Sequence, residues 1–232
     1  MKKTISFNKN EKRVVLIGAG EMNRCESIGI KKGIPKEPDM NIEEDFVIAL
    51  DGGLAVCEEY GIVPDLIVGD FDSLPEEKMC LLNQYPQEII HRLPCEKDDT
   101  DTLAAMKLAI EMGFTEFVIY GGLGGRISHT MANIQSLFFL KEHGLHGVLK
   151  GNGCEVFLLK NESCILSDRK SGYLSVFAYS EKAEGVYLKN LKYELENAQL
   201  TNAFPLGVSN EFIGKKAEIG VEHGVLLLVA EA

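Results

Sequence analysis

The sequence has no segment that could cross a membrane, because no apolar run approaches the roughly 20 residues that a spanning helix needs. Residues 1–3 are not followed by an apolar run or a small-residue cleavage site, so we expect no signal peptide and a cytoplasmic protein. Basic residues are scarce: 24 Lys and Arg stand against 35 Asp and Glu, which gives a net charge of −11. We therefore expect no nucleic-acid partner. A phosphate ligand that binds together with a divalent metal is still compatible with this negative charge.

The 6 cysteines include no C-x-x-C pair, which argues against a disulfide framework or a zinc site. We interpret them as reduced thiols, with Cys57 and Cys80 buried as small apolar residues in predicted helices. His143 and His146 have H-x-x-H spacing but no companion ligands, so we expect them on a surface loop.

Two common phosphate-binding signatures are missing as well. No G-x-x-x-x-G-K-[ST] occurs, and "GAGEMN" at 18–23 does not complete G-x-G-x-x-G, because Asn23 stands where the third glycine should be. Any nucleotide must therefore be bound by another scheme.

The first part of the chain alternates short apolar runs with amphipathic stretches. Strands are expected at 14–17, 46–50, 66–68, 89–90 and 117–120, and helices near 54–60, 75–85, 100–112 and 129–143. This alternation is typical of a parallel sheet covered by helices on both faces. Residues 21–45 are irregular and polar, and we expect a long loop there with at most one helical turn.

From about residue 150 the pattern changes to short apolar runs with turn signals every 8–12 residues. Such spacing, without a helical pattern, predicts an antiparallel sandwich or barrel. We therefore expect an α/β domain over 1–150 and an all-β domain over 151–232, with the boundary near 150–153.

Acidic residues follow several of the predicted strands. Asp51 follows one strand, Asp70 and Asp72 follow the next, and Asp98 and Asp101 precede a helix. Carboxyl ends of parallel strands meet at one edge of a sheet, where ligands bind. If 70–72 is extended, Asp70 and Asp72 face the same way and can share one Mg²⁺. Taken singly, these acids could instead form turns, a helix N-cap at 98 or 99, and a favourable charge in a first helical turn.

The run "GGLGGRISHTMANI" at 121–134 lies between a predicted strand and a predicted helix. Its glycines let backbone N–H groups approach a phosphate, and the helix N-terminus favours anions. Arg126 and His129 can neutralise phosphate charge or donate to a leaving oxygen, although Arg126 could equally be a solvated surface group.

Six motifs follow one another along the chain: "ALDGG" (49–53), "PDLIVGDFDSL" (64–74), "KDDTD" (97–101), "GGLGGRISHTMANI" (121–134), "LKNLKYELEN" (188–197) and "GVSNEF" (207–212). Together and in this order, they resemble the thiamin pyrophosphokinase family. The resemblance implies a Rossmann-like N-terminal domain, an all-β C-terminal domain taken here as a sandwich, and a homodimer. It implies transfer of the β,γ-diphosphoryl group of ATP to the hydroxyl of thiamin, with AMP released and Mg²⁺ required.

Residue by residue, the resemblance implies three groups. The residues implied for catalysis and metal binding are Asp70, Asp72 and Asp98. Those implied to contact the nucleotide are Asp51, Lys97, Asp101, Arg126 and His129. Those implied to contact thiamin, in the site of the partner subunit, are Tyr193, Ser209 and Asn210. Two positions depart from the family pattern: Ser128 stands where relatives carry aspartate, and Asn190 where they carry glycine. We assign no role to Ser128, and Asp98 is a candidate acceptor for the hydroxyl proton.

Two other functions stay open. "IVGDFDSL" superficially matches a D-x-D phosphohydrolase in which Asp70 is the nucleophile and Asp72 the general acid. That class requires Thr or Val two residues after the second Asp, where this chain has Leu74. The second alternative is a catalytically inactive sensor that binds thiamin or a nucleotide. An inactive sensor is expected to lack an acid, yet none of the acids named above is missing.

Overall fold

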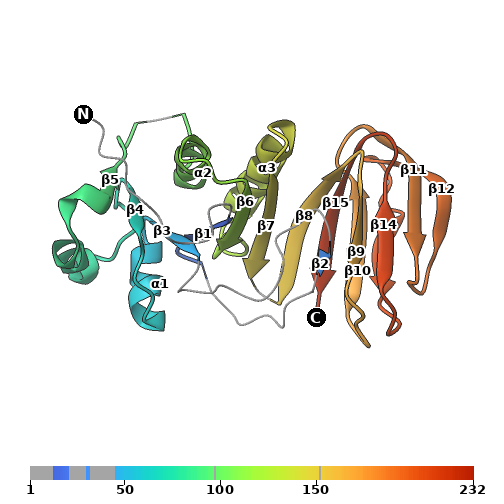
Figure 1. The fold of residues 1–232 in the computed structure, drawn as a ribbon, viewed down its shortest axis with the longest axis horizontal. Coiled ribbons are helices and arrows are strands. Elements are labelled where there is room, and N and C mark those ends of the chain that lie inside the picture. Colours follow the sequence, from blue (N-terminus) through green and yellow to red (C-terminus); the bar gives the residue numbers. More distant parts are fainter. Residues whose placement is uncertain (1–12, 21–29, 32–44, 97, 152) are drawn as a thin grey trace.

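The protein is described by a computed structural model that covers residues 13–20, 30–31, 45–96, 98–151 and 153–232. A ten-stranded mixed sheet runs through the molecule in the order β13-β10-β15-β8-β7-β6-β1-β3-β4-β5, and a five-stranded antiparallel sheet, β12-β11-β14-β9-β2, accompanies it (Figure 1). The expected α/β and all-β halves are therefore both present, in the form of one large mixed sheet and one antiparallel sheet.

Six neighbouring strands of this sheet, in the order β7-β6-β1-β3-β4-β5, are parallel, and the sequence predicted five of them. They are β1 (Arg13–Ile17), β3 (Phe46–Leu50), β4 (Leu66–Gly69), β5 (Ile90–Arg92), β6 (Glu116–Tyr120) and β7 (His146–Gly151). Strand β7 was not predicted, and the surface loop expected at His143 and His146 is wrong for His146. His146 is the first residue of β7, and its half-buried side chain accepts a hydrogen bond at Nδ1 from Lys141 Nζ (3.0 Å).

Helices and 3₁₀ turns cover the parallel strands. The helices are α1 (Gly53–Tyr60), α2 (Asp101–Glu111) and α3 (Ile127–Glu142), and the 3₁₀ segments are η1 (Glu76–Gln84) and η2 (Gln87–Ile89). Leu16 points into a core formed with α2 and α3, whereas Ile17 points into a core that includes α1 and η1. The sheet is thus apolar on both faces, which explains the continuous apolar runs in its strands.

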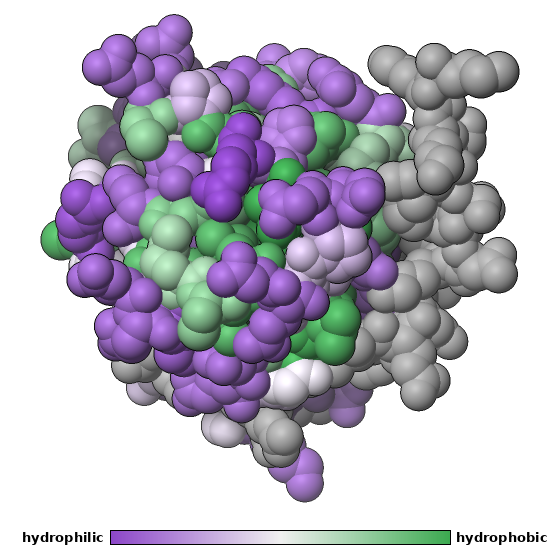
Figure 2. All heavy atoms as spheres, turned by 90° about the vertical axis from the view of Figure 1, so that its left-hand side faces the viewer, coloured by the Kyte–Doolittle hydropathy of each residue, from purple (hydrophilic) through white to green (hydrophobic). Residues whose placement is uncertain are grey.

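The stretch near 75–85 is a 3₁₀ segment rather than the predicted helix. Cys57 lies in the core, where burial raises the pKa of its thiol to about 12, but Cys80 is exposed, which corrects the expectation that it is buried. Figure 2 views the end of the molecule that carries η1 and β5, where hydrophilic side chains surround smaller apolar areas.

The remaining strands are antiparallel, as expected for the second half. They are β8 (Cys154–Lys160), β9 (Ser163–Leu166), β10 (Tyr173–Ala178), β11 (Lys182–Lys189), β12 (Leu195–Thr201), β13 (Gly207–Glu211), β14 (Ala217–Gly220) and β15 (Val225–Glu231). Strand β2 (Ile30–Lys31) pairs with β9 and lies inside the segment 21–45 that was expected to be a loop. The rest of that segment lies outside the described residues.

The large sheet continues across the expected domain boundary, because β7 and β8 pair directly as an antiparallel hairpin. One apolar core likewise includes side chains from both parts of the chain, for example Val15 and Ile219. The division at 150–153 therefore stays a prediction about organisation within a continuous sheet. Within the described residues, no helix is long and apolar enough to cross a membrane.

Candidate functional site

The candidate site is a cavity of about 800 Å³ at the carboxyl ends of the parallel strands. Its walls come from the segments that follow β1, β3 and β6, together with the start of α2 and α3. Strand β1 lies between β3 and β6, so the chain order reverses at this point of the sheet. Open α/β sheets bind their ligands in the crevice at such a switch point.

Three carboxylates converge at this edge. Asp51, Asp70 and Asp101 each offer an oxygen within 4.8 Å of the other two. Asp51 comes directly after β3 with a positive φ of 49° and is 6% exposed. Burial and the neighbouring carboxylates of Asp101 and Asp72 raise the pKa of Asp51, although a hydrogen bond with Ser73 opposes this shift.

Close packing of two strand ends brings these carboxylates together. A Cβ placed on Gly69, the last residue of β4, would lie 2.9 Å from the Cα of Asp51. Only glycine therefore lets β4 approach β3 this closely just before Asp70. The glycine in "VGD" thus has a packing role that no motif by itself revealed.

The extended geometry expected for residues 70–72 is wrong. Phe71 has a φ of 66° and its ring is buried, and the Asp72 N–H donates to Asp70 Oδ1 (3.2 Å). This turn places Asp72 at the surface, where its Oδ1 accepts from Ser73 Oγ (3.0 Å). Asp70 joins the carboxylate cluster and Asp72 stays outside it, close enough to influence the pKa of Asp51.

The acids before α2 also separate. Thr100 is the N-cap, and its Oγ1 accepts from the Leu103 N–H (3.2 Å), so neither Asp98 nor Asp99 is the cap. Asp101 begins the helix and joins the cluster, whereas Asp98 lies exposed before the cap and does not share a helical face with Asp101. Lys97, the predicted nucleotide contact, lies outside the described residues.

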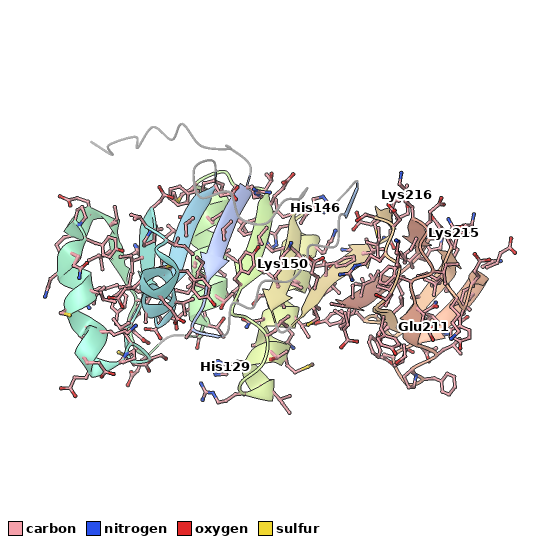
Figure 3. All side chains as sticks on the ribbon, turned by 90° about the horizontal axis from the view of Figure 1, so that it is seen from below. His129, His146, Lys150, Glu211, Lys215 and Lys216 are labelled. Carbon is pink, nitrogen blue, oxygen red and sulfur yellow. The ribbon has the colours of Figure 1, made fainter. Side chains whose placement is uncertain are left out.

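The glycine-rich segment after β6 lines the cavity, as expected, and leads into α3. Arg126 occupies the N-cap position of α3 without a side-chain cap, and the first turn carries no acid. Arg126 and His129 both line the cavity (Figure 3 labels His129). The buried Asn133 donates from Nδ2 to the Gly122 carbonyl (2.8 Å) and ties the loop to the helix. A helix N-terminus with glycines and an arginine suits a phosphate.

Sequence reasoning missed Ser73 and residues 18–20 as cavity residues. Residues 18–20 follow β1 at the switch point, but the incomplete G-x-G-x-x-G motif concealed their place. Ser73 could have been found only from its position directly after the D-x-D motif.

The carboxylate cluster fits a hard divalent cation. All three groups offer oxygen atoms, which Mg²⁺ prefers, and Mg²⁺ uses few protein carboxylates when a phosphate supplies further ligands. The buried Oδ1 of Asp51 has no hydrogen-bond partner among the described residues. A buried carboxylate oxygen without a donor is costly unless a cation meets it.

The predicted thiamin residues lie in the other half of the chain. Tyr193, in the turn between β11 and β12, is 58% exposed, and Ser209 in β13 is exposed with a φ of 58°. Asn210 is 3% exposed, and its carboxamide bonds to the backbone. None of the three lines the cavity, and Figure 3 shows Glu211, beside Asn210, in a different half of the molecule from His129.

Comparison with known proteins covers most of the chain. Residues 39–149 match the family model described as thiamin pyrophosphokinase, catalytic domain, and residues 162–226 match the one described as its vitamin B1 binding domain. A thiamine pyrophosphokinase of Bacillus subtilis is 30% identical over 210 residues, which are 88% of this chain and 97% of the relative.

Solved structures are similar as well. The crystal structure of thiamine pyrophosphokinase from B. subtilis has a TM-score of 0.78 at 25% identity and covers 95% of this chain and 99% of its own. A thiamin pyrophosphokinase family protein from Enterococcus faecalis has a TM-score of 0.75 at 26% identity, with the same coverage.

Proposed function

Because the chain belongs to the thiamin pyrophosphokinase family, we propose that its cavity binds ATP with Mg²⁺ and transfers the diphosphoryl group to thiamin. The oxygen of the thiamin hydroxyl attacks the β-phosphorus, and the bond from that phosphorus to the α,β-bridging oxygen breaks. The products are thiamin diphosphate and AMP, and the hydroxyl proton passes to a base. The carboxylate cluster of Asp51, Asp70 and Asp101, beside a phosphate-compatible helix N-terminus, is the observation that supports this proposal most strongly.

We assign the metal chiefly to this cluster. Asp70 was expected there on sequence grounds, whereas Asp51 and Asp101 were expected to contact the nucleotide. When bound, Mg²⁺ would neutralise the polyphosphate and polarise the attacked phosphorus. Asp72, expected to hold the metal, would instead add negative charge beside the cluster. Asp98 lies outside the cluster and keeps only its expected role as candidate acceptor of the hydroxyl proton.

Three side chains would orient the nucleotide: Arg126, His129 and Lys97. Arg126 and His129 line the cavity at the start of α3. The charges of Arg126 and Lys97 would offset the triphosphate charge that the metal leaves, and diphosphoryl transfer depends mainly on such positioning. In a protein with a net charge of −11, this local placement of cations matters more than the overall balance.

We interpret residues 1–150 as a Rossmann-like catalytic domain and residues 151–232 as a β-sandwich domain that binds thiamin. The exposed ring of Tyr193 offers an aromatic face to the flat, cationic thiamin. We place the reaction in the cytoplasm. The described cysteines form no disulfide among themselves, which suits that compartment.

Two copies of the chain would complete one site. The thiamin residues do not line the cavity of their own chain, so a partner copy is proposed to bring its Tyr193 surface to the cavity. Exposed apolar side chains in the same half of the chain, on the segment that leads into β13, are suited to a protein interface: Phe204 (66%), Leu206 (53%) and Val208 (44%). Light scattering tests the dimer, and Leu206→Glu should shift the protein towards monomer and lower its activity, with Tyr60→Glu as a control on another exposed apolar side chain.

The first experiment incubates the purified protein with ATP, Mg²⁺ and thiamin and resolves both products by chromatography. Thiamin diphosphate and AMP in equal amounts support diphosphoryl transfer. ADP with thiamin monophosphate would mean monophosphoryl transfer instead. Binding of thiamin without any product would favour the inactive sensor, and release of phosphate with a trappable phosphoaspartate would favour the D-x-D phosphohydrolase.

A further inference from the structure

We propose that Asn210 is a positioning residue that holds the backbone of Tyr193, so that the tyrosine ring is presented to thiamin in one place. This inference rests on the proposed function, and it changes the role that the sequence suggests for Asn210. Its side chain does not contact thiamin directly; it acts through Tyr193.

The hydrogen bonds of Asn210 carry this proposal. Its Oδ1 accepts from the backbone N–H of Tyr193 (2.9 Å) and from that of Glu211 (2.9 Å), and its Nδ2 donates to the Tyr193 carbonyl (2.6 Å). The two N–H groups need an acceptor and the carbonyl needs a donor, so the network itself determines which way the amide points. The side chain is 3% exposed and already committed to these three bonds, which leaves it little capacity to bind a ligand.

The turn that carries Tyr193 is also restrained at its other residues. Asn190, where family members carry glycine, has a φ of 60°, which asparagine tolerates, and its Nδ2 donates to the Lys216 carbonyl (2.9 Å). The Glu194 carboxylate accepts from the Asn190 N–H (2.7 Å), and the Lys192 N–H donates to the Glu211 carbonyl (3.0 Å). The backbone is therefore held on both sides of Tyr193.

The side chain of Tyr193 is largely exposed, whereas its backbone is held by hydrogen bonds. Tyr193 is 58% exposed, and Lys192 Nζ lies 5.3 Å from the centroid of its ring. Lys192 in turn pairs with Glu211 (2.5 Å). Holding an exposed aromatic ring in one place contributes little to the folding free energy, because the ring is not buried. Such ordering lowers the entropy cost of binding when a ligand stacks on it.

The experiment uses the absence of tryptophan from the chain. Tyr193→Trp introduces a single tryptophan, whose fluorescence reports on thiamin binding and whose anisotropy reports on ring mobility. Adding Asn210→Ala should lower the anisotropy and weaken thiamin binding by up to about tenfold, because a mobile ring has to be ordered when thiamin binds. Asn161→Ala is the matched control, since Asn161 also accepts a backbone N–H, that of Gly224 (2.8 Å), in another turn of the same half.

Kinetics in the tyrosine background separate positioning from direct contact. Asn210→Ala should raise KM for thiamin while kcat and KM for ATP stay within about twofold, and it should add nothing in a Tyr193→Ala background. Effects that add fully in the double variant, or unchanged anisotropy and affinity in the reporter, would overturn the proposal. If Asn210→Ala does not fold, Asn210→Ser, which keeps an acceptor for one N–H, allows the same comparison.

Failure of the proposed function and failure of the role proposed for Asn210 give different results. If wild-type protein makes no thiamin diphosphate, the proposed function is wrong. If it makes thiamin diphosphate but thiamin does not change the fluorescence of Trp at position 193, the assignment of Tyr193 is wrong, and that of Asn210 with it.

Discussion

At the scale of single residues, Asp51 combines three features that rarely occur together. It is buried, it lies beside two other carboxylates, and one of its oxygens has no hydrogen-bond partner among the described residues. A side chain in such a place costs folding free energy. Under the proposed function, the Mg²⁺ that accompanies ATP would offset this cost.

We expect Asp51→Asn to lower kcat about 100-fold or more, since a preorganised charge at the reacting phosphates is lost. Without metal, the variant should be at least as stable as the wild type, because repulsion from Asp101 and Asp72 is relieved. Mg²⁺ should raise the melting temperature of the wild type but not of the variant. Asp168→Asn, at an exposed acid in the all-β half, is the control; equal Mg²⁺ responses in the wild type and Asp51→Asn would refute the metal assignment.

The surroundings of His146 should make the folding stability depend on pH. Burial and then the Lys141 ammonium lower its pKa, while Glu162 and Glu116 oppose this shift, and Lys141 also pairs with the carboxylate of Glu162. The unfolded chain therefore binds the proton more tightly than the folded one. The stability contribution is complete above the unfolded pKa of about 6.5 and is lost as pH falls through it towards the lower folded pKa.

His146→Gln should remove this contribution, because glutamine can still accept from Lys141 but does not titrate. Thermal melts between about pH 8 and about pH 5 should show a smaller loss of stability for the variant than for the wild type. Parallel curves for the two proteins would mean that His146 does not contribute.

At the scale of elements, the ends of β3 and β4 set the geometry of the carboxylate cluster. Gly69→Ala places a methyl group 2.9 Å from the Cα of Asp51 and must push the two strand ends apart. We expect at least about a tenfold loss of kcat, because sub-ångström positioning of the acids is disturbed.

Gly61→Ala provides the control for that substitution. Gly61 has a φ of 66° at the end of α1, and a Cβ there meets nothing within 4 Å. It should cost roughly 1–2 kcal/mol of folding stability through backbone strain and leave kcat unchanged. If both alanine variants lose activity equally, lower stability rather than strand spacing is the cause.

At the scale of the whole molecule, the ten-stranded sheet makes the two halves interdependent. Strands β7 and β8 pair directly, and one apolar core includes residues from both halves. We therefore expect both halves to unfold together, in a single calorimetric transition whose calorimetric enthalpy equals its van't Hoff enthalpy. Two separated transitions would show that residues 1–150 and 151–232 fold as independent domains.

The sequence by itself predicted the strands that carry the site. The runs at 46–50, 66–68 and 117–120 are buried on both faces and so are continuously apolar, and the acids and glycines after them mark the edge where ligands bind. It also predicted the antiparallel character of the second half and, through motif order, the family. These features are local in sequence, so a pattern of neighbouring residues is enough to reveal them.

Only the tertiary structure decided which acids meet. The positive φ of Phe71 turns Asp72 away from the cluster, and the N-cap at Thr100 leaves Asp98 before the helix, while Asp51 enters from a different strand. Likewise, Asn210 reaches Tyr193 across 17 positions of sequence. Contacts of this kind depend on backbone conformation and strand order, which the spacing of residues along the chain does not specify.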